Sequence, residues 1–179
     1  MKISLSWIKE LVDLKDISTD EIVSKLTMSG LEVEDVVDQT NLYKNFIVGF
    51  VKETEKHPNA DKLTICKVFD GKDDLQVICG ASNVKAGQKI VFAPMGTEIP
   101  NGNFLIKKAK IRGVESHGMI CAEDELLLSN DHSGIMVLDE KLEAGRSITE
   151  ALNLDDVILE IAITPNRPDA LSHVGVARD

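Results

Sequence analysis

Four basic side chains lie within six residues of this sequence, at Lys107, Lys108, Lys110 and Arg112. The whole chain has 20 basic and 30 acidic residues and a formal net charge of -10, so this cluster runs against the overall balance. Closely spaced cations can neutralise successive phosphates of a nucleic acid, which makes binding local and dependent on salt. The same lysines could instead discourage aggregation at a strand edge. Charge alone favours neither reading.

The basic residues are concentrated in the middle of the chain. Residues 44–112 contain 12 basic and 7 acidic side chains, a net charge of +5. Residues 1–40, 113–151 and 152–179 have net charges of -5, -7 and -3. A polyanion would therefore meet one favourable surface on a chain that otherwise repels it.

Composition restricts the class of protein. The hydrophobic content of 43% and charged content of 28% are typical of a soluble globular protein. No apolar run approaches the roughly 20 residues of a membrane span, and the N-terminal residues do not resemble a secretory signal. The three cysteines are far apart, which favours buried thiols in a reducing cytosol. We therefore expect a cytoplasmic protein without a membrane partner.

Other chemistries have weak support. Glu123, Asp124 and Glu125 could form a metal or acid–base site with His132, but neighbouring carboxylates diverge and no second histidine has ligand spacing. The segment 80–83 lacks the second glycine and the lysine of a P-loop. We predict no catalytic residue and no metal site.

The first 40 residues predict a compact α/β unit. A helix is expected to open at Ser6, with Trp7, Ile8 and Leu11 on its apolar face. Ser18 and Glu21 form a capping box for a second helix, which Gly30 ends before an extended segment.

The middle of the chain predicts many short strands separated by turn residues, which is typical of a small closed barrel. The expected strands are 46–52, 63–69, 75–79, 89–92, 111–114, 118–122 and 135–138. In an extended segment Lys108, Lys110 and Arg112 would share one face, opposite Ala109 and Ile111. The five phenylalanines are expected mostly in the core, so phosphate contacts to a folded RNA are favoured over base stacking.

The C-terminal residues are predicted to belong to the same unit as the first 40 residues. Ser147 and Glu150 form a capping box for a helix over 149–152, a strand follows over 157–163, and Asp169 is expected to cap a helix over 170–177. That helix has no terminator, so we expect the chain to be a fragment of a longer protein. Residues 1–40 and 152–179 would complete one split domain, with residues 41–151 inserted between them.

Three internal segments and three flanking segments resemble a known family. HPNADKLTICKV (57–68), VICGASNV (77–84) and IRGVESHGMICA (111–122) resemble the signature blocks of tRNA-binding oligonucleotide-binding (OB) barrels. MKISLSWIKELVDL, LTMSGLEVEDV and TPNRPDALSHVGVARD resemble the N-terminus of bacterial phenylalanyl-tRNA synthetase β subunits. The resemblance extends over all 179 residues in the same order.

This resemblance implies an α+β fold, with a five-stranded OB-fold β-barrel inserted into a small split α/β domain. Such synthetases are α2β2 heterotetramers that attach phenylalanine to tRNA(Phe) with ATP and Mg2+. The expected partners are tRNA, the synthetase α subunit and a second β subunit. We expect the fragment itself to be non-catalytic, to hold no cofactor and to contribute an auxiliary tRNA contact and assembly surface.

With the resemblance included, a set of residues is expected to contact tRNA. The set is Lys62, Lys67, Asn83, Lys108, Lys110, Arg112 and Ser116. Lys108, Lys110 and Arg112 form the main basic stripe, whereas Lys62 and Lys67 are weaker candidates. Asn83 and Ser116 could donate hydrogen bonds to RNA, or Asn83 could only close a turn and Ser116 only cap a bend.

Two other functions stay open. The barrel could bind protein rather than RNA and serve as a subunit-interaction module. The chain could also resemble free-standing tRNA-binding chaperones, which the flanking segments disfavour.

Overall fold

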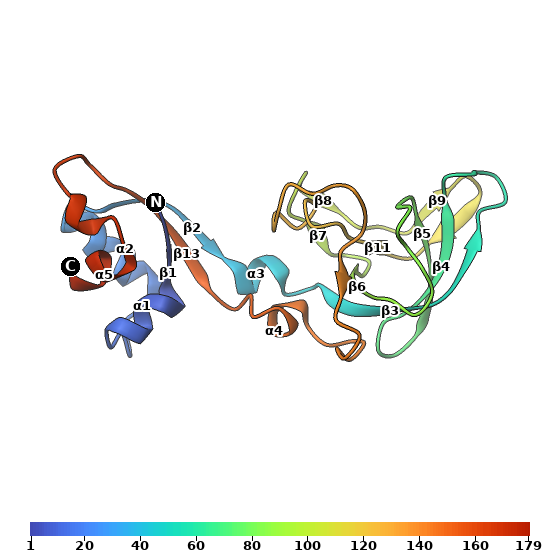
Figure 1. Cartoon of the computed structure of the whole chain (residues 1–179), viewed down its shortest axis with the longest axis horizontal. Helices are drawn as coiled ribbons and strands as arrows, with labels where there is room; N and C mark the ends of the chain where they lie inside the picture. Colours follow the sequence, from blue (N-terminus) through green and yellow to red (C-terminus); the bar gives the residue numbers. More distant parts are fainter. The chain divides into compact units, whose positions relative to one another are not determined.

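The computed structural model describes residues 1–179 and separates them into two compact units, Met1–Leu42 with Leu154–Asp179, and Tyr43–Asn153 (Figure 1). The first unit is built from both ends of the chain. Its antiparallel sheet has the order β1 (Lys2–Ser4), β13 (Val157–Ala162), β2 (Glu32–Asp38). The C-terminal strand β13 thus lies between two strands from the N-terminal segment, and neither segment could form this sheet alone.

Short helices complete the core of the first unit. They are α1 (Leu5–Leu11), α2 (Thr19–Met28), the 3-10 helix η1 (Pro168–Ala170) and α5 (His173–Arg178). The Ser18 hydroxyl accepts a hydrogen bond from the Glu21 amide at 3.2 Å, and Gly30 follows the helix end with φ +92°, so both predicted boundaries of α2 are confirmed. Ile3, Leu31, Leu159 and Ile161 are fully buried between sheet and helices.

The prediction for α1 is confirmed for the burial of Ile8 but wrong for the start of the helix and for the burial of Trp7 and Leu11. Ser4 caps the helix, its hydroxyl accepting from the Trp7 amide at 3.0 Å, because Leu5 already belongs to the helix. The helix therefore buries Leu5 and Ile8, whereas Trp7 and Leu11 are 55% and 47% exposed. Trp7 instead stacks on His173, with ring centroids 4.2 Å apart.

Two other predicted caps are wrong. Ser172 caps α5 by accepting from the Gly175 amide, while Asp169 lies in η1 and its carboxylate pairs with Arg167 and Arg178. The helix α4 (Ile148–Ala151) follows Ser147, but the Ser147 hydroxyl donates to Thr149 Oγ1 rather than accepting from an amide. Asp169 is therefore held by two arginine side chains, and Ser147 is hydrogen-bonded to another side chain rather than to a helix amide.

The second unit is a nearly closed antiparallel barrel, which confirms the predicted α+β fold. Strand order is β11 (Met119–Ile120), β6 (Lys89–Ala93), β3 (Ile47–Lys56), β4 (Thr64–Phe69), β5 (Asp74–Cys79), and β12 (Val137–Leu138) also pairs with β6. Strand β11 returns against β5, so the two ends of the sheet meet. The short helix α3 (Gln39–Tyr43) lies where the chain passes from one unit to the other.

The barrel interior is filled by alternating apolar side chains. Val51, Val68, Val77, Ile90 and Phe92 are fully buried. Cys66, Cys79 and Cys121 are also buried, and burial raises the pKa of each thiol, to about 12 for Cys66. These cysteines therefore behave as small hydrophobic residues, as the sequence predicts.

Two small hairpins lie beside the barrel. The predicted strand over 111–114 is wrong: β9 (Ala109–Ile111) ends at a turn through Arg112 and Gly113, and β10 (Val114–Ser116) returns. Both turn residues have positive φ, 49° and 95°, as a tight two-residue hairpin turn requires. The other hairpin, β7 (Glu98–Ile99) and β8 (Phe104–Leu105), has no counterpart in the sequence prediction.

The phenylalanines do not all belong to the core. Phe46 and Phe92 are fully buried, and Phe50 and Phe69 are half-buried beneath the ammonium groups of Lys89 and Lys52. Phe104 is 46% exposed, so the prediction is wrong there. Its strand has only two residues and does not pair with the barrel sheet.

No helix of this structure is both long enough and apolar enough to cross a membrane.

Gly118 provides a test of the barrel packing. Its φ is +143°, and a Cβ there would lie 2.4 Å from the Phe92 ring and 3.0 Å from the Ala93 carbonyl oxygen. We expect Gly118→Ala to lower the free energy of unfolding by about 3 kcal/mol or more, since backbone strain and overpacking add. Gly87→Ala is the matched control, because Gly87 has φ +91° but no neighbour within 4 Å. Urea unfolding followed by circular dichroism measures both, and equal losses would contradict this packing.

Candidate nucleic-acid interface

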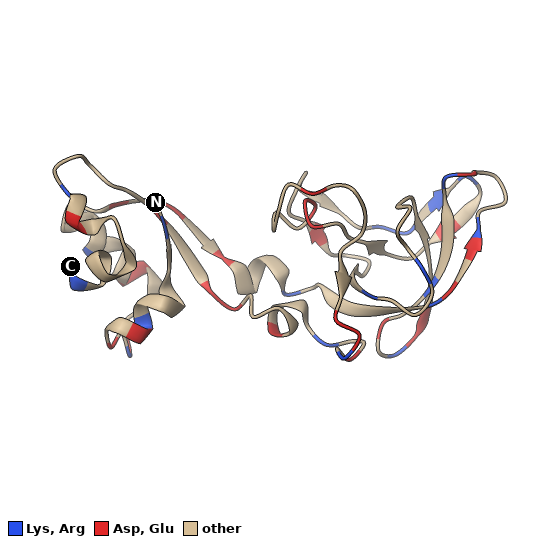
Figure 2. Cartoon of the chain, in the orientation of Figure 1, with Lys and Arg blue, Asp and Glu red and all other residues tan.

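The basic cluster lies on and beside the β9–β10 hairpin of the barrel unit (Figure 2). Lys107 and Lys108 precede β9, Lys110 lies within it and Arg112 occupies the turn, and all four side chains are exposed. The predicted single stripe along one strand face is therefore wrong for Arg112, because the chain reverses there. The four basic side chains lie instead on one hairpin and on the residues just before it.

Side-chain hydrogen bonds to the backbone hold this hairpin in place. His57 Nε2 lies 3.1 Å from the Ile111 carbonyl oxygen, and Asn59 Nδ2 donates to the Arg112 carbonyl at 3.1 Å. The Asn59 amide donates to His57 Nδ1 at 3.1 Å, so Nε2 carries the proton that the Ile111 carbonyl accepts. On the other strand, Gln76 Nε2 donates to the Glu115 carbonyl at 2.7 Å. The hairpin is thus joined both to the β3–β4 connection and to β5.

Most cations of the hairpin have no acidic partner. Lys108 Nζ pairs with Glu115 Oε2 at 2.9 Å, and this contact lowers the pKa of the Glu115 carboxyl group. Lys107, Lys110 and Arg112 form no ion pair. Their positive charge is therefore available to an external anion.

The two weaker lysine candidates differ in their surroundings. Lys62 is exposed and unpaired in the same connection as Asn59, which contacts the hairpin turn. Lys67 lies on β4 within 3.4 Å of Glu53 and 3.7 Å of Asp74, and Asp74 also pairs with Lys52. The Lys52 hydrogen bond is the largest of the contacts that lower the Asp74 pKa. The structure thus places Lys62 in the segment that meets the hairpin, and Lys67 in a separate charge network.

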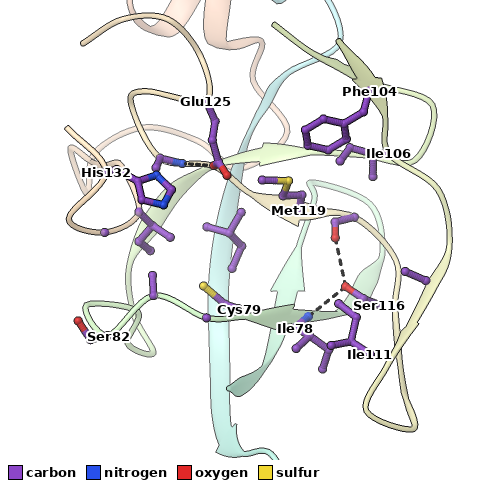
Figure 3. Close-up of a pocket in the computed structure, with 18 of the residues that line it drawn as sticks. Ile78, Cys79, Ser82, Phe104, Ile106, Ile111, Ser116, Met119, Glu125 and His132 are labelled. Atoms are coloured by element: carbon purple, nitrogen blue, oxygen red, sulfur yellow. Dashed lines mark hydrogen bonds between the residues drawn. The ribbon is translucent and has the colours of Figure 1, made fainter. Parts of the chain in front are cut away.

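Ser116 and Asn83 are occupied by the fold. The buried Ser116 hydroxyl accepts from the Ile78 amide at 3.1 Å and donates to the Gly118 carbonyl at 3.2 Å (Figure 3). Asn83 donates to the Ile135 carbonyl at 3.0 Å and accepts from the Ile135 amide at 2.9 Å. The hydrogen bonds of both residues fit a structural role in a turn and a bend better than a hydrogen bond to RNA.

A groove of about 820 Å³ opens on the barrel unit beside these residues (Figure 3). Strands β5 and β11 contribute Ile78, Met119 and Ile120, and β8 contributes the exposed Phe104. Lys107 connects the groove to the basic hairpin. Neither this groove nor the exposure of Phe104 is predicted from the sequence, although Pro100, Asn101 and Gly102 before Phe104 are residues typical of a turn.

Among the other residues that line the groove, Glu125 and His132 have ionisable side chains. Glu125 Oε2 accepts from the Ala122 amide at 2.7 Å, and burial raises the pKa of this carboxyl group. His132 Nδ1 lies 2.8 Å from Asp124 Oδ2, which raises the His132 pKa. Glu123 turns instead to the Ser129 hydroxyl. No group of three or more His, Cys, Asp or Glu side chains converges as metal ligands would.

A family model described as "Putative tRNA binding domain" matches residues 46–147, which include the barrel strands, the basic hairpin and the groove. The chain belongs to this tRNA binding domain family. The OB-type barrel signature found in the sequence is thereby confirmed.

Beyond the tRNA binding domain, the whole chain is similar to phenylalanine–tRNA ligase beta subunits. The Fusobacterium nucleatum protein is 50% identical over 180 residues, and the Chlorobaculum tepidum protein is 51% identical over 183 residues. Each alignment covers 100% of this chain and 22% of the relative. The chain thus spans about a fifth of the length of these relatives, and the predicted resemblance to the β subunits is confirmed.

Two solved structures match part of this chain. An MetRS related protein from Pyrococcus horikoshii has 22% identity and a TM-score of 0.46, and covers 64% of this chain and 98% of its own. The C-terminal domain of Plasmodium vivax p43 has 24% identity and a TM-score of 0.41, and covers 61% of each chain.

The contact between Asp124 and His132 predicts a titration next to the groove. Because Asp124 stabilises the protonated imidazole, the pKa of His132 is raised in the folded chain. The contact therefore stabilises the fold at low pH, and its contribution disappears as the pH rises through the raised pKa. In NMR titrations, Asp124→Asn should lower the His132 pKa towards its ordinary value. Asp131→Asn is the control and should change it less, so equal shifts would contradict this assignment.

Proposed function

We propose that this chain is a segment of a phenylalanine–tRNA ligase beta subunit whose barrel contacts tRNA through the β9–β10 hairpin. The observation that carries the proposal is the placement of Lys107, Lys110 and Arg112, three exposed cations without an acidic partner, on a hairpin fixed to the barrel. Lys62 extends this surface from the neighbouring connection. Phosphate contacts of this kind orient an RNA without reading its sequence.

The proposed parent enzyme joins phenylalanine to tRNA(Phe) with ATP and Mg2+, which residues outside this chain would bind. The barrel would add affinity and orientation for tRNA, while chemistry takes place elsewhere in an α2β2 assembly in the cytoplasm. The similarity to phenylalanine–tRNA ligase beta subunits over the whole chain supports this assignment.

The first unit favours a role in subunit assembly. Trp7 on α1 and Val174 on α5 are more than half exposed, and Leu171 beside α5 is also exposed. Exposed apolar side chains of this size are typical of a surface that another chain covers. We therefore propose that the split unit contacts the ligase α subunit or the second β subunit, while the barrel contacts tRNA.

The barrel contact predicts a specific salt dependence. Fluorescence anisotropy across a salt series measures binding of labelled tRNA to the chain. Lys110→Ala/Arg112→Ala should reduce the log–log salt slope by about 1.5 to 2 units, because two phosphate contacts are lost.

The matched control is Lys72→Ala/Lys141→Ala, which removes the same charge from two exposed, unpaired lysines on the loops at 70–73 and 139–146 of the barrel unit. This control should keep the wild-type slope. Equal slopes for both double variants, or no binding at low salt, would contradict the hairpin contact and favour a barrel that binds protein.

A further inference from the structure

The groove on the barrel has the size and lining of a small-molecule site. Its volume of about 820 Å³ falls in the usual range of roughly 300–1,000 Å³ for ligand pockets. Ile78, Met119 and Ile120 give it an apolar lining. Such a lining suits the flat, weakly polar face of a nucleobase far better than a hydrated phosphate.

Phe104 provides an aromatic face at this groove. Its ring is 46% exposed and is one of the side chains that line the groove (Figure 3). A Cβ on Gly102 would lie 3.3 Å from the Phe104 ring, so the ring lies close to the preceding turn. Exposed aromatic rings in nucleic-acid-binding barrels stack on unpaired bases.

The groove is lined by side chains of opposite charge. Lys107 brings a cation from the basic hairpin, and Glu125 brings a carboxyl group whose Oε2 accepts from the Ala122 amide. Glu125 Oε1 has no hydrogen-bond partner. A carboxylate repels phosphate and accepts hydrogen bonds from amino groups, so a nucleotide would place its phosphate near Lys107 and its base edge near Glu125.

We propose that this groove binds one unpaired RNA base that carries an exocyclic amino group, with Phe104 stacking on the base and Glu125 accepting from the amino group. The inference rests on the proposed tRNA contact, since the basic hairpin would bring the RNA backbone to the groove. Cytosine, adenine and guanine have such an amino group. Uracil has no amino group and carries O4, a hydrogen-bond acceptor, at the position where cytosine carries its amino group.

Short single-stranded RNAs test the base preference. Labelled hexamers of cytidine and of uridine are titrated into the chain at low salt, and binding is followed by fluorescence anisotropy. The cytidine hexamer should bind about tenfold more tightly than the uridine hexamer, within the range for one specific base contact. Glu125→Gln should remove this preference, because the amide still accepts from Ala122 but can also donate to a uracil carbonyl.

Phe104 is tested separately. Phe104→Ala should weaken binding of both hexamers by about tenfold, and Phe104→Tyr should restore it, because a ring of either kind stacks. Val137→Ala is the control, since Val137 is similarly exposed on β12 but does not line the groove. Unfolding measurements on each variant identify any loss caused by misfolding.

The two proposals fail in different ways. Equal affinity for the two hexamers, or a Phe104→Ala variant that binds like the wild type, would overturn the base site. If tRNA binding still depended on Lys110 and Arg112, the hairpin contact would survive that result. If neither tRNA nor either hexamer bound at low salt, both proposals would be overturned.

Discussion

A few side-chain hydrogen bonds to the backbone determine where the basic residues of this protein lie. The β9–β10 hairpin has only three residues in each strand, and a ribbon of that size is not stable on its own. His57, Asn59 and Gln76 donate to carbonyl groups of the hairpin and thereby attach it to the barrel. Because the barrel fixes the hairpin, RNA binding would not have to order it, which lowers the entropic cost of the contact.

The hairpin and the side chains proposed to bind RNA at the groove come from residues 104–125, while β5 and the loop at 132–135 complete the lining of the groove. Phe104 and Lys107 precede the hairpin, Ser116 ends it, and Glu125 follows after β11. The Ser116 hydroxyl joins the Ile78 amide of β5 to the Gly118 carbonyl, so it fixes the distance between the hairpin and the floor of the groove. A single segment therefore provides both the phosphate contacts and the side chains proposed to bind the base.

The long strands of the barrel can be predicted well from the sequence, whereas the short hairpins cannot. Strands β4 and β5 follow from alternating apolar residues, because burial of one face in the barrel imposes that alternation, whereas β6 follows from a continuous apolar run that is buried throughout. The turn at Arg112 and Gly113 was missed, since Ile111 and Val114 on either side look like parts of one strand. The exposure of Phe104 could not be predicted, because it depends on how a two-residue strand packs rather than on its own neighbours in sequence. Asn83 and Ser116 were recognised as important, but hydrogen-bond geometry was needed to assign them to the fold.

Hydrogen–deuterium exchange of the chain with and without tRNA tests most directly whether this hairpin and groove form the RNA surface. We predict that tRNA slows exchange in residues 104–116, together with the groove loops at 80–82 and 132–135, and leaves the loop at 70–73 unchanged. Protection confined to the split unit, or spread evenly over both units, would contradict this prediction.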